Sequence, residues 1–354
     1  MQDRPSDIRS AAALMALLSI RGIGPKTALR IAYFDEDLDL ALGERLSDFL
    51  PGLTEARHEL ERCHEDGIRA VSIFDPDYPQ RLRAIPDPPP VLFIGGSLEA
   101  LDRDRVIGVV GTREPTDFGA SATEEIVAAL APGQWVVVSG LAKGIDTIAH
   151  RAALGHHTPT TAVMAGGLDR IYPAENRGLA REILDQGGAL VSEHRVGVAP
   201  NRAAFVRRNR IQSGLSAALV VTQTGISGGT MHTVRHAAAQ GRPLFCAEPH
   251  TDNPRSEGLR VLLGTPARGL CEVLPAWKDA RELCAKLGEE PLARPLTREN
   301  LADLAGVLDQ VLDADTQRNP EPRWWPEGRS MLEARDQVRP HDRDAPLFAV
   351  SDKR

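Results

Sequence analysis

The residues with the greatest capacity for chemistry in this chain are arginines. Residues 195–216 hold five arginines and no carboxylate, and three of the five lie in the run Arg207-Arg208-Asn209-Arg210. The whole chain has a formal net charge of -7, so the cluster is a local excess of positive charge. Such an excess indicates a site for an anion, and a polyanion is the obvious candidate.

Three glycine-bearing turns, each after a short apolar run, offer further groups for the same anion. Glycine lets backbone N–H groups approach an oxyanion, and the start of a following helix favours negative charge. The second turn also carries the only lysine between residues 101 and 275. The candidate residues are Gly111, Thr112 and Arg113; Ser139, Gly140, Lys143 and Gly144; and Ser227, Gly228, Gly229 and Thr230.

Motifs of common enzyme classes are absent from the sequence. No turn ends in the Gly-Lys-Ser/Thr of a P-loop, none fits G-x-G-x-x-G, and no G-x-S-x-G elbow is present. The ten histidines show no metal-ligand spacing. We therefore predict no catalytic residue, no metal and no cofactor, with Asp146 in an internal hydrogen bond or as a cap near the helix start, His150 as a packing residue and Glu193 in a structural role.

The elements that must position these turns follow an alternating pattern. Apolar runs at residues 106–110, 136–138, 161–164 and 219–221 each lead through glycine into a helical stretch. Continuous apolar strands that alternate with helices predict an α/β fold, an extended Rossmann-like and mostly parallel sheet with helices on both faces. Ligands of such sheets bind at the carboxyl ends of the strands, where the glycines lie.

Composition divides the chain into three parts. Residues 1–70 are predicted to form a small all-α domain, residues 71–275 the sheet domain with a first edge strand at 91–95, and residues 276–354 a helical segment and weakly ordered tail. Over residues 101–275 the basic residues, 18, outnumber the acidic ones, 16, whereas residues 1–100 and 276–354 are net acidic. Within the first part, Gly22-Ile23-Gly24-Pro25 fits a phosphate-binding helix-hairpin-helix or SAM-like domain, or equally a plain corner between helices.

Cysteine usage and hydropathy favour a cytoplasmic protein. The four cysteines form no C-x-x-C pair, and so few in a chain of 354 residues predict reduced thiols. The longest apolar run, residues 11–20, is shorter than the roughly 20 residues that a membrane span needs. No membrane association is expected.

Taken in order, the motifs resemble those of the DprA (Smf) DNA-processing family over roughly residues 70–250. The ordered set is far more specific than any one of its members. It consists of Gly111-Thr112-Arg113, the run from Ser139 to Asp146, Gly167-Leu168-Asp169 with Tyr172-Pro173 and Glu175-Asn176, Ser192-Glu193, Arg207-Arg208-Asn209-Arg210-Ile211, and Gln240-Gly241-Arg242.

The resemblance implies a non-enzymatic protein that binds single-stranded DNA in a basic pocket, forms homodimers and helps to load the RecA recombinase during natural transformation. Carried over by position, the phosphate-binding residues are Arg113, Lys143, Arg207, Arg208 and Arg210. Alternate exposure on a helix predicts that at least one of the last three turns inward to pair or pack. Bases could stack on Phe205, or Phe205 could belong to the core.

The chain departs from the family pattern at several points. Val206 stands where the family usually has proline, Thr222 where it has an acidic residue, and Ser-Gly-Gly-Thr replaces Ser-Gly-Ser-Leu. No winged helix is recognisable after residue 270.

Two other interpretations remain open. The glycine-rich loop is loosely similar to that of lysine-decarboxylase-like phosphoribohydrolases, but the glutamate that those enzymes need is replaced by Met231-His232-Thr233. That interpretation predicts mononucleotide binding. In the third, the arginines only form internal ion pairs, although residues 195–216 contain no acidic partners for them.

Overall fold

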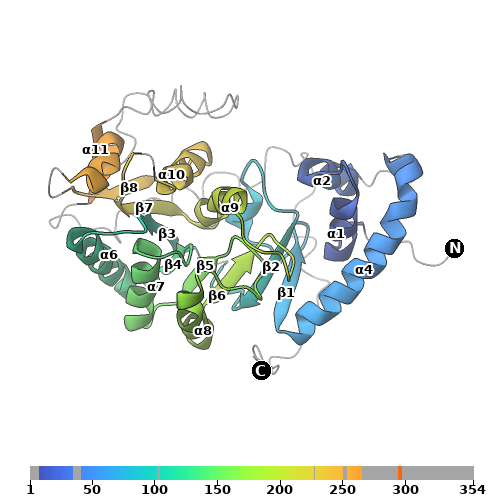
Figure 1. Ribbon diagram of the computed structural model, residues 1–354, viewed down its shortest axis with the longest axis horizontal. Coiled ribbons are helices and arrows are strands. Elements are labelled where there is room, and N and C mark those ends of the chain that lie inside the picture. Colours follow the sequence, from blue (N-terminus) through green and yellow to red (C-terminus); the bar gives the residue numbers. More distant parts are fainter. Residues whose placement is uncertain are drawn as a thin grey trace.

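The computed structural model describes residues 8–34, 41–101, 104–226, 228–249, 253–264 and 294–296. Ser227 of the predicted site lies outside them, as does nearly all of the predicted C-terminal part, residues 276–354. The described part is a mixed α/β structure built on one sheet (Figure 1).

The sheet has the strand order β1-β2-β6-β5-β4-β3-β7-β8-β9. The pairs β1–β2 and β2–β6 are antiparallel, and all other neighbouring strands are parallel. The predicted mostly parallel sheet is therefore confirmed. The strands are β1 (Ile68–Ser72), β2 (Val91–Gly96), β3 (Val106–Gly111), β4 (Val136–Ser139), β5 (Thr160–Val163), β6 (Ala189–Ser192), β7 (Ala218–Gln223), β8 (Leu244–Ala247) and β9 (Arg294–Leu296).

Successive side chains of the central strands enter two different cores. Val109 and Val220 pack with helices α6 (Asp117–Leu130) and α7 (Ile145–Gly155), whereas Val110 and Val221 pack with α10 (Thr230–Ala239) and α11 (Glu257–Gly264). Alternation across the pleat puts apolar residues on both faces, which is why these strands read as continuous apolar runs. Helix α8 (Arg177–Asp185) lies beside α7, and α9 (Arg202–Leu215) beside α10 (Figure 1).

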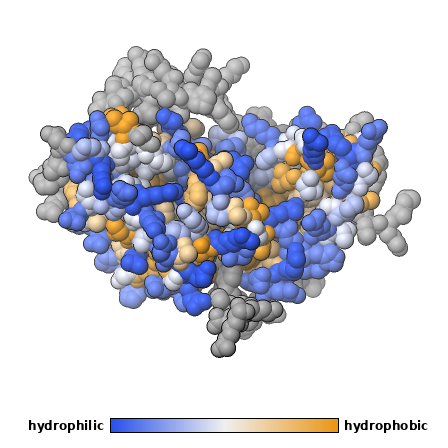
Figure 2. All heavy atoms as spheres, in the orientation of Figure 1, coloured by the Kyte–Doolittle hydropathy of each residue, from blue (hydrophilic) through white to orange (hydrophobic). Residues whose placement is uncertain are grey.

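The N-terminal helices pack against the β1 edge of the sheet (Figure 1). They are α1 (Ala11–Ser19), α2 (Pro25–Phe34) and α4 (Leu46–Glu65), and the short α5 (Gln80–Arg83) precedes β2. Leu14, Phe49 and Phe93 belong to one apolar cluster, so the helical part and the sheet share a continuous core. The face drawn in Figure 2 is largely hydrophilic, and no helix among the described residues is long and apolar enough to cross a membrane.

The expected edge position of residues 91–95 is wrong. These residues do form a strand, β2, but β1 pairs with its outer side, from Ile68 opposite Gly95 to Ser72 opposite Val91. The five residues of β1 follow directly on the long helix α4 and include the polar Arg69, which conceals the strand in the sequence. The predicted turn between α1 and α2 is present, with Gly22 at φ +85°; its role in phosphate binding stays a prediction.

His150 is fully buried on α7, as the predicted packing role requires. Its Nδ1 lies 2.8 Å from the hydroxyl of Thr160, and that hydroxyl donates its only proton to the Val137 carbonyl. Nδ1 must therefore carry a proton, whereas the buried Nε2 has no hydrogen-bond partner in the part of the chain that the structure describes. Burial, with a smaller effect of the Arg208 charge, lowers the pKa of His150 to about 3.

We expect His150 to make folding sensitive to mild acid. Its pKa is lower in the folded state than the 6.5 of an unperturbed histidine, so protons bind preferentially to the unfolded chain as the pH falls below 6.5. This one group removes about 2 kcal/mol from the free energy of unfolding between pH 7.5 and pH 5. Urea titrations at both pH values measure the decrease in the free energy of unfolding between them. This decrease should be about 2 kcal/mol smaller in His150→Gln than in wild type. In His156→Gln, which changes an exposed histidine, the decrease should equal that of wild type. An equal decrease in the free energy of unfolding in wild type and His150→Gln would show that His150 does not cause the acid sensitivity.

Candidate anion-binding cavity

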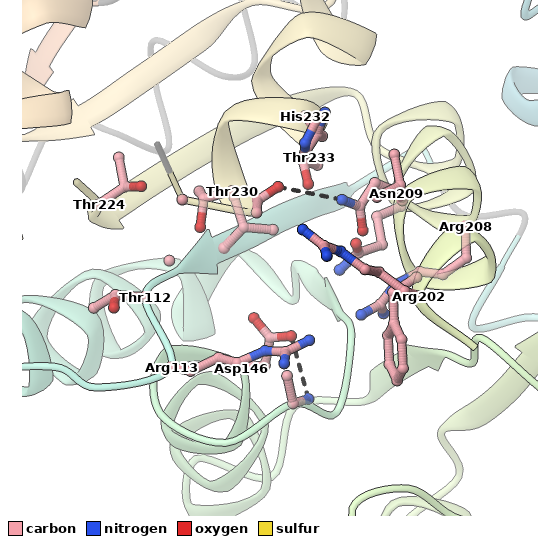
Figure 3. Close-up of a pocket in the computed structure, with 18 of the residues that line it drawn as sticks. Thr112, Arg113, Asp146, Arg202, Arg208, Asn209, Thr224, Thr230, His232 and Thr233 are labelled. Carbon is pink, nitrogen blue, oxygen red and sulfur yellow. Dashed lines mark hydrogen bonds between the residues drawn. The ribbon is translucent and has the colours of Figure 1, made fainter. Parts of the chain in front are cut away.

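A cavity of about 770 Å³ opens at the carboxyl ends of β3 and β7. The turn after β3 forms one side of it, and α9 and the first turn of α10 form the other sides (Figure 3). Residues from three of the four predicted groups contribute to the wall. The predicted residues that line it are Gly111, Thr112, Arg113, Arg208, Asn209, Gly228, Gly229 and Thr230.

Arg208 is the most enclosed cation of the cavity, with 4% of its surface exposed. One Nη donates to the carbonyl of Val163, and the buried Nε has no hydrogen-bond partner among the described residues. No carboxylate among the described residues is within ion-pair distance of it. Burial lowers the pKa of Arg208 to about 10, opposed by the nearby Asp146 carboxylate and assisted by the Arg113 charge. Its hydrogen-bonding capacity is therefore incompletely used inside the protein.

Glycines in the neighbouring turns create the space for this arrangement. A Cβ at Gly140 would overlap the guanidinium of Arg208. Gly144 has φ +79° and lies so close to Thr112 and Arg113 that a Cβ would overlap their backbone. Gly140 and Gly144 do not line the cavity themselves; they let the turn after β4 pack against the residues that do.

Asp146 lies at the start of α7, and one carboxylate oxygen accepts from the backbone N–H of Ala142 at 3.3 Å (Figure 3). Burial raises the pKa of this carboxyl, against the effects of the Arg208 charge and of hydrogen bonds from the turn. The predicted internal hydrogen bond near the helix start is present, but Asp146 does not cap α7, and it also lines the cavity.

Arg113 is exposed and places its guanidinium 5.3 Å from the centre of the Phe205 ring. Arg208 lies 6.0 Å from the same ring. Such cation–π contacts orient a guanidinium without neutralising it. Arg113 has no hydrogen bond or ion pair with any described residue, so its N–H groups are available to a ligand.

The glycine-rich loop leads into the N-terminus of α10. No side chain of a described residue caps this helix, and a Cβ at Gly229 would meet nothing within 4 Å. The amide of Asn209 reaches across from α9 to the Gly229 carbonyl at 3.4 Å (Figure 3). The uncapped end of α10 adds a favourable electrostatic environment for an anion.

The family described as DNA recombination-mediator protein A matches residues 69–280, more than half of the chain. The chain belongs to the DprA (Smf) family of DNA-processing proteins.

Relatives and solved structures agree with this membership. DprA of Bacillus subtilis is 36% identical over 230 residues, 65% of this chain and 76% of its own length. Protein Smf of Escherichia coli is 41% identical over 204 residues, 58% of this chain and 54% of its own length. DprA of Streptococcus pneumoniae has 30% identity and a TM-score of 0.61 over 72% of this chain and 92% of its own.

DprA of Helicobacter pylori has 26% identity and a TM-score of 0.55 over 69% of this chain and 96% of its own. Its structure is described as revealing a single-stranded DNA binding mode of that protein. Membership of the DprA family assigns this chain a role in DNA processing.

Several of the residues that the DprA resemblance nominates lie outside the cavity wall. Lys143 is exposed and forms an ion pair with Glu175 at 2.6 Å. Ser139 is buried and donates to the Val109 carbonyl at 2.7 Å. Arg207 is exposed on α9. Their part in binding stays a prediction.

Arg210 points inward, which confirms that at least one arginine of the cluster pairs inside the protein. Its guanidinium is 2.8 Å from Glu193 and 3.0 Å from Asp87, and only 8% of its side chain is exposed. Burial lowers its pKa, but the two carboxylates outweigh that effect and the pKa is raised. The interpretation in which the arginines form internal ion pairs is thus right for Arg210.

The structure shows the environment of two residues that differ from the DprA pattern, Thr222 and Val206. Thr222 is buried and accepts a hydrogen bond from the Thr123 hydroxyl at 2.9 Å, so two neutral hydroxyls pair where the family usually has an acidic residue. Val206 lines the cavity.

The site also contains residues that the sequence did not single out. Arg202 begins α9, is exposed, lines the cavity and has no ion pair with a described residue. Tyr172 and Gln212 line it as well. Arg202 belonged to the arginine-rich stretch from the outset, and its place at the start of α9, next to the capping residue Asn201, is the signal that could have identified it.

We expect Arg210 to stabilise the folded protein through its ion pairs. Removing it in Arg210→Ala leaves Glu193 and Asp87 without their partner, which costs roughly 3–5 kcal/mol for a buried pair. The matched control is Arg207→Ala, because Arg207 is exposed on the same helix and should change the free energy of unfolding by less than about 0.5 kcal/mol. Urea denaturation measures the free energy of unfolding of both variants. If both variants lose less than about 0.5 kcal/mol, the ion pairs of Arg210 contribute little to stability.

Proposed function

We propose that this DprA-family protein binds single-stranded DNA in the cavity between β3, α9 and α10, without catalysing a reaction. The observation that carries the proposal is Arg208, a buried guanidinium with unused hydrogen-bond donors that lines an open cavity. A phosphate would complete its hydrogen bonds and balance its charge. The description of the Helicobacter pylori relative as a single-strand DNA binder supports the same ligand.

Two further arginines extend the site towards solvent. Arg113 and Arg202 reach into the cavity from different sides (Figure 3), and both are exposed. A strand that enters the cavity can therefore continue past it while neighbouring phosphates contact these arginines. Contacts of this kind recognise the backbone, so they predict sequence-tolerant and salt-sensitive binding.

The wider role follows the family resemblance. We propose that the protein forms homodimers, protects incoming single strands and helps to load the RecA recombinase onto them during natural transformation. A cytoplasmic location is part of this proposal, and it is supported by the buried, unpaired state of Cys63 and Cys246.

The direct test is a fluorescence anisotropy titration with an oligothymidylate, a duplex of the same length and a mononucleotide. The proposal predicts tight binding of the single strand, weaker binding of the duplex and no competition by the mononucleotide at similar concentration. Preferential binding of the mononucleotide would favour the phosphoribohydrolase-like interpretation instead.

Arg202 and Arg207 offer a matched pair of charge deletions. Both are exposed on α9, but only Arg202 lines the cavity. Arg202→Ala should weaken oligothymidylate binding by roughly tenfold, the value of one charge-assisted hydrogen bond, and should reduce the slope of log K against log salt by about 0.7.

Arg207→Ala should leave both the affinity and the slope close to wild type, because Arg207 does not line the cavity. That result would show that the phosphate-binding role implied for Arg207 by the family resemblance is wrong. If the two variants lose affinity equally, the binding comes from the general positive charge of α9, and the cavity is not the site.

A further inference from the structure

The turn that carries Arg113 is held at both ends by one residue, Gln223. At the start of the turn, the N–H of Thr112 donates to the backbone carbonyl of Gln223 at 2.8 Å. At its end, the N–H of Thr116 donates to the side-chain Oε1 of Gln223 at 2.9 Å. Arg113 lies between these two anchors and lines the cavity (Figure 3). Gln223 therefore fixes the backbone from which the Arg113 side chain extends.

The amide of Gln223 is fully buried and also binds two hydroxyls. Its Nε2 donates to Thr116 Oγ1 at 2.9 Å and to Ser256 Oγ at 3.1 Å. Thr116 is the N-cap of α6, and Ser256 ends the short helix η4 (Pro254–Ser256) that precedes α11. One side chain thus joins the turn after β3, the start of α6 and the segment before α11.

A β-bulge directs this side chain towards α6. Strand β7 carries one extra residue, Thr222, so that Gln223 pairs with Gly111 of β3. Regular alternation along a strand would turn Thr222 and Gln223 to opposite faces of the sheet. Here the first contacts a hydroxyl of α6 and the second the N-cap of the same helix. Bulges commonly redirect a side chain next to a functional site.

The amide occupies a close-fitting space and does not reach the ligand. A Cβ at Gly119 of α6 would overlap the side chain of Gln223, so the amide has little freedom to move. Gln223 itself does not line the cavity, whereas the next residue, Thr224, does. Any effect of Gln223 on a ligand must therefore act through the segments that it holds.

We propose that Gln223 is a positioning residue of the DNA-binding cavity, which fixes the turn after β3 so that Arg113 meets a phosphate of the strand. This inference rests on the proposed binding of single-stranded DNA. Arg113 has no hydrogen bond or ion pair with a described residue, so the turn and the Phe205 ring determine its direction. Without the amide of Gln223, the turn adopts further conformations in which Arg113 misses the phosphate, and the affinity falls.

The test is a double-mutant cycle, measured by fluorescence anisotropy with an oligothymidylate. Arg113→Ala should weaken binding by roughly tenfold, the value of one charge-assisted hydrogen bond. Gln223→Met keeps the length of the side chain and removes the hydrogen bonds of its amide. It should weaken binding by about three- to tenfold, because part or all of the Arg113 contact is lost.

The cycle shows whether Gln223 acts through Arg113. When Arg113 is already alanine, Gln223→Met should change the affinity by less than about twofold, because the side chain that it positions is gone. When Arg202 is alanine instead, Gln223→Met should keep its full effect, since Arg202 begins α9 and Gln223 does not hold it.

Thr123→Val is the matched control for a structural effect. Thr123 is buried on α6 and donates to the Thr222 hydroxyl of the same bulge, but it does not touch the turn. This variant should bind like wild type. Thr116→Val removes the hydroxyl that Gln223 binds, and it should repeat the loss of affinity and the dependence on Arg113 if Gln223→Met does not fold. Thermal unfolding of each variant confirms that folded proteins are compared.

The outcomes separate the two proposals. If Arg113→Ala weakens binding but Gln223→Met and Thr116→Val do not, the positioning role is wrong and the proposed DNA binding stands. The positioning role is also wrong if Gln223→Met has the same effect with and without Arg113. If wild type does not bind the oligothymidylate, both proposals fail.

Discussion

The buried guanidinium of Arg208 constrains the structure around it. A charge in the interior is costly unless it is paired or hydrogen-bonded, and here a single backbone carbonyl, the Phe205 ring and the field of Asp146 are its surroundings. The guanidinium fits only because Gly140 has no side chain. Residues from the turns after β4 and β5 and from α9 therefore converge on a group that the free protein leaves incompletely satisfied. Such a group is stabilised when an anion enters the cavity.

Three neighbouring arginines of α9 lie in different environments and have different roles. Arg208 faces the cavity, Arg207 faces solvent, and Arg210 fastens the helix to Glu193 and Asp87. Arg195, in the loop that leads into α9, donates to Glu59 of α4 at 3.3 Å and to the Met15 carbonyl of α1 at 2.7 Å. The N-terminal helices thus contact the loop that carries the cap of α9. Ion pairs outside the cavity thus hold both α9 itself, through Arg210, and the loop that precedes it, through Arg195.

The sequence predicted the sheet well because its central strands are buried on both faces and read as unbroken apolar runs. It concealed β1, which is short, partly polar and continuous with a long helix. The turns of the site were predictable from glycine placement, but the direction of each charged side chain was not. Arg210 forms an ion pair with Asp87, which lies more than a hundred residues away in the sequence, and Lys143 forms one with Glu175. Arg202 could have been identified from its place next to the capping residue Asn201, whereas Gln212 has no local signature and only the tertiary arrangement shows that it lines the cavity.

The most direct measurement is the thermal unfolding midpoint of wild type and Arg208→Met, each with and without saturating oligothymidylate. Methionine keeps the length and apolar contacts of the side chain and removes its charge and donors. Ligand that binds only the folded state raises the midpoint, by a few degrees at about a hundred times the dissociation constant. We predict that rise in wild type and none in Arg208→Met. The same rise in both proteins would contradict the assignment of Arg208 as the centre of the site.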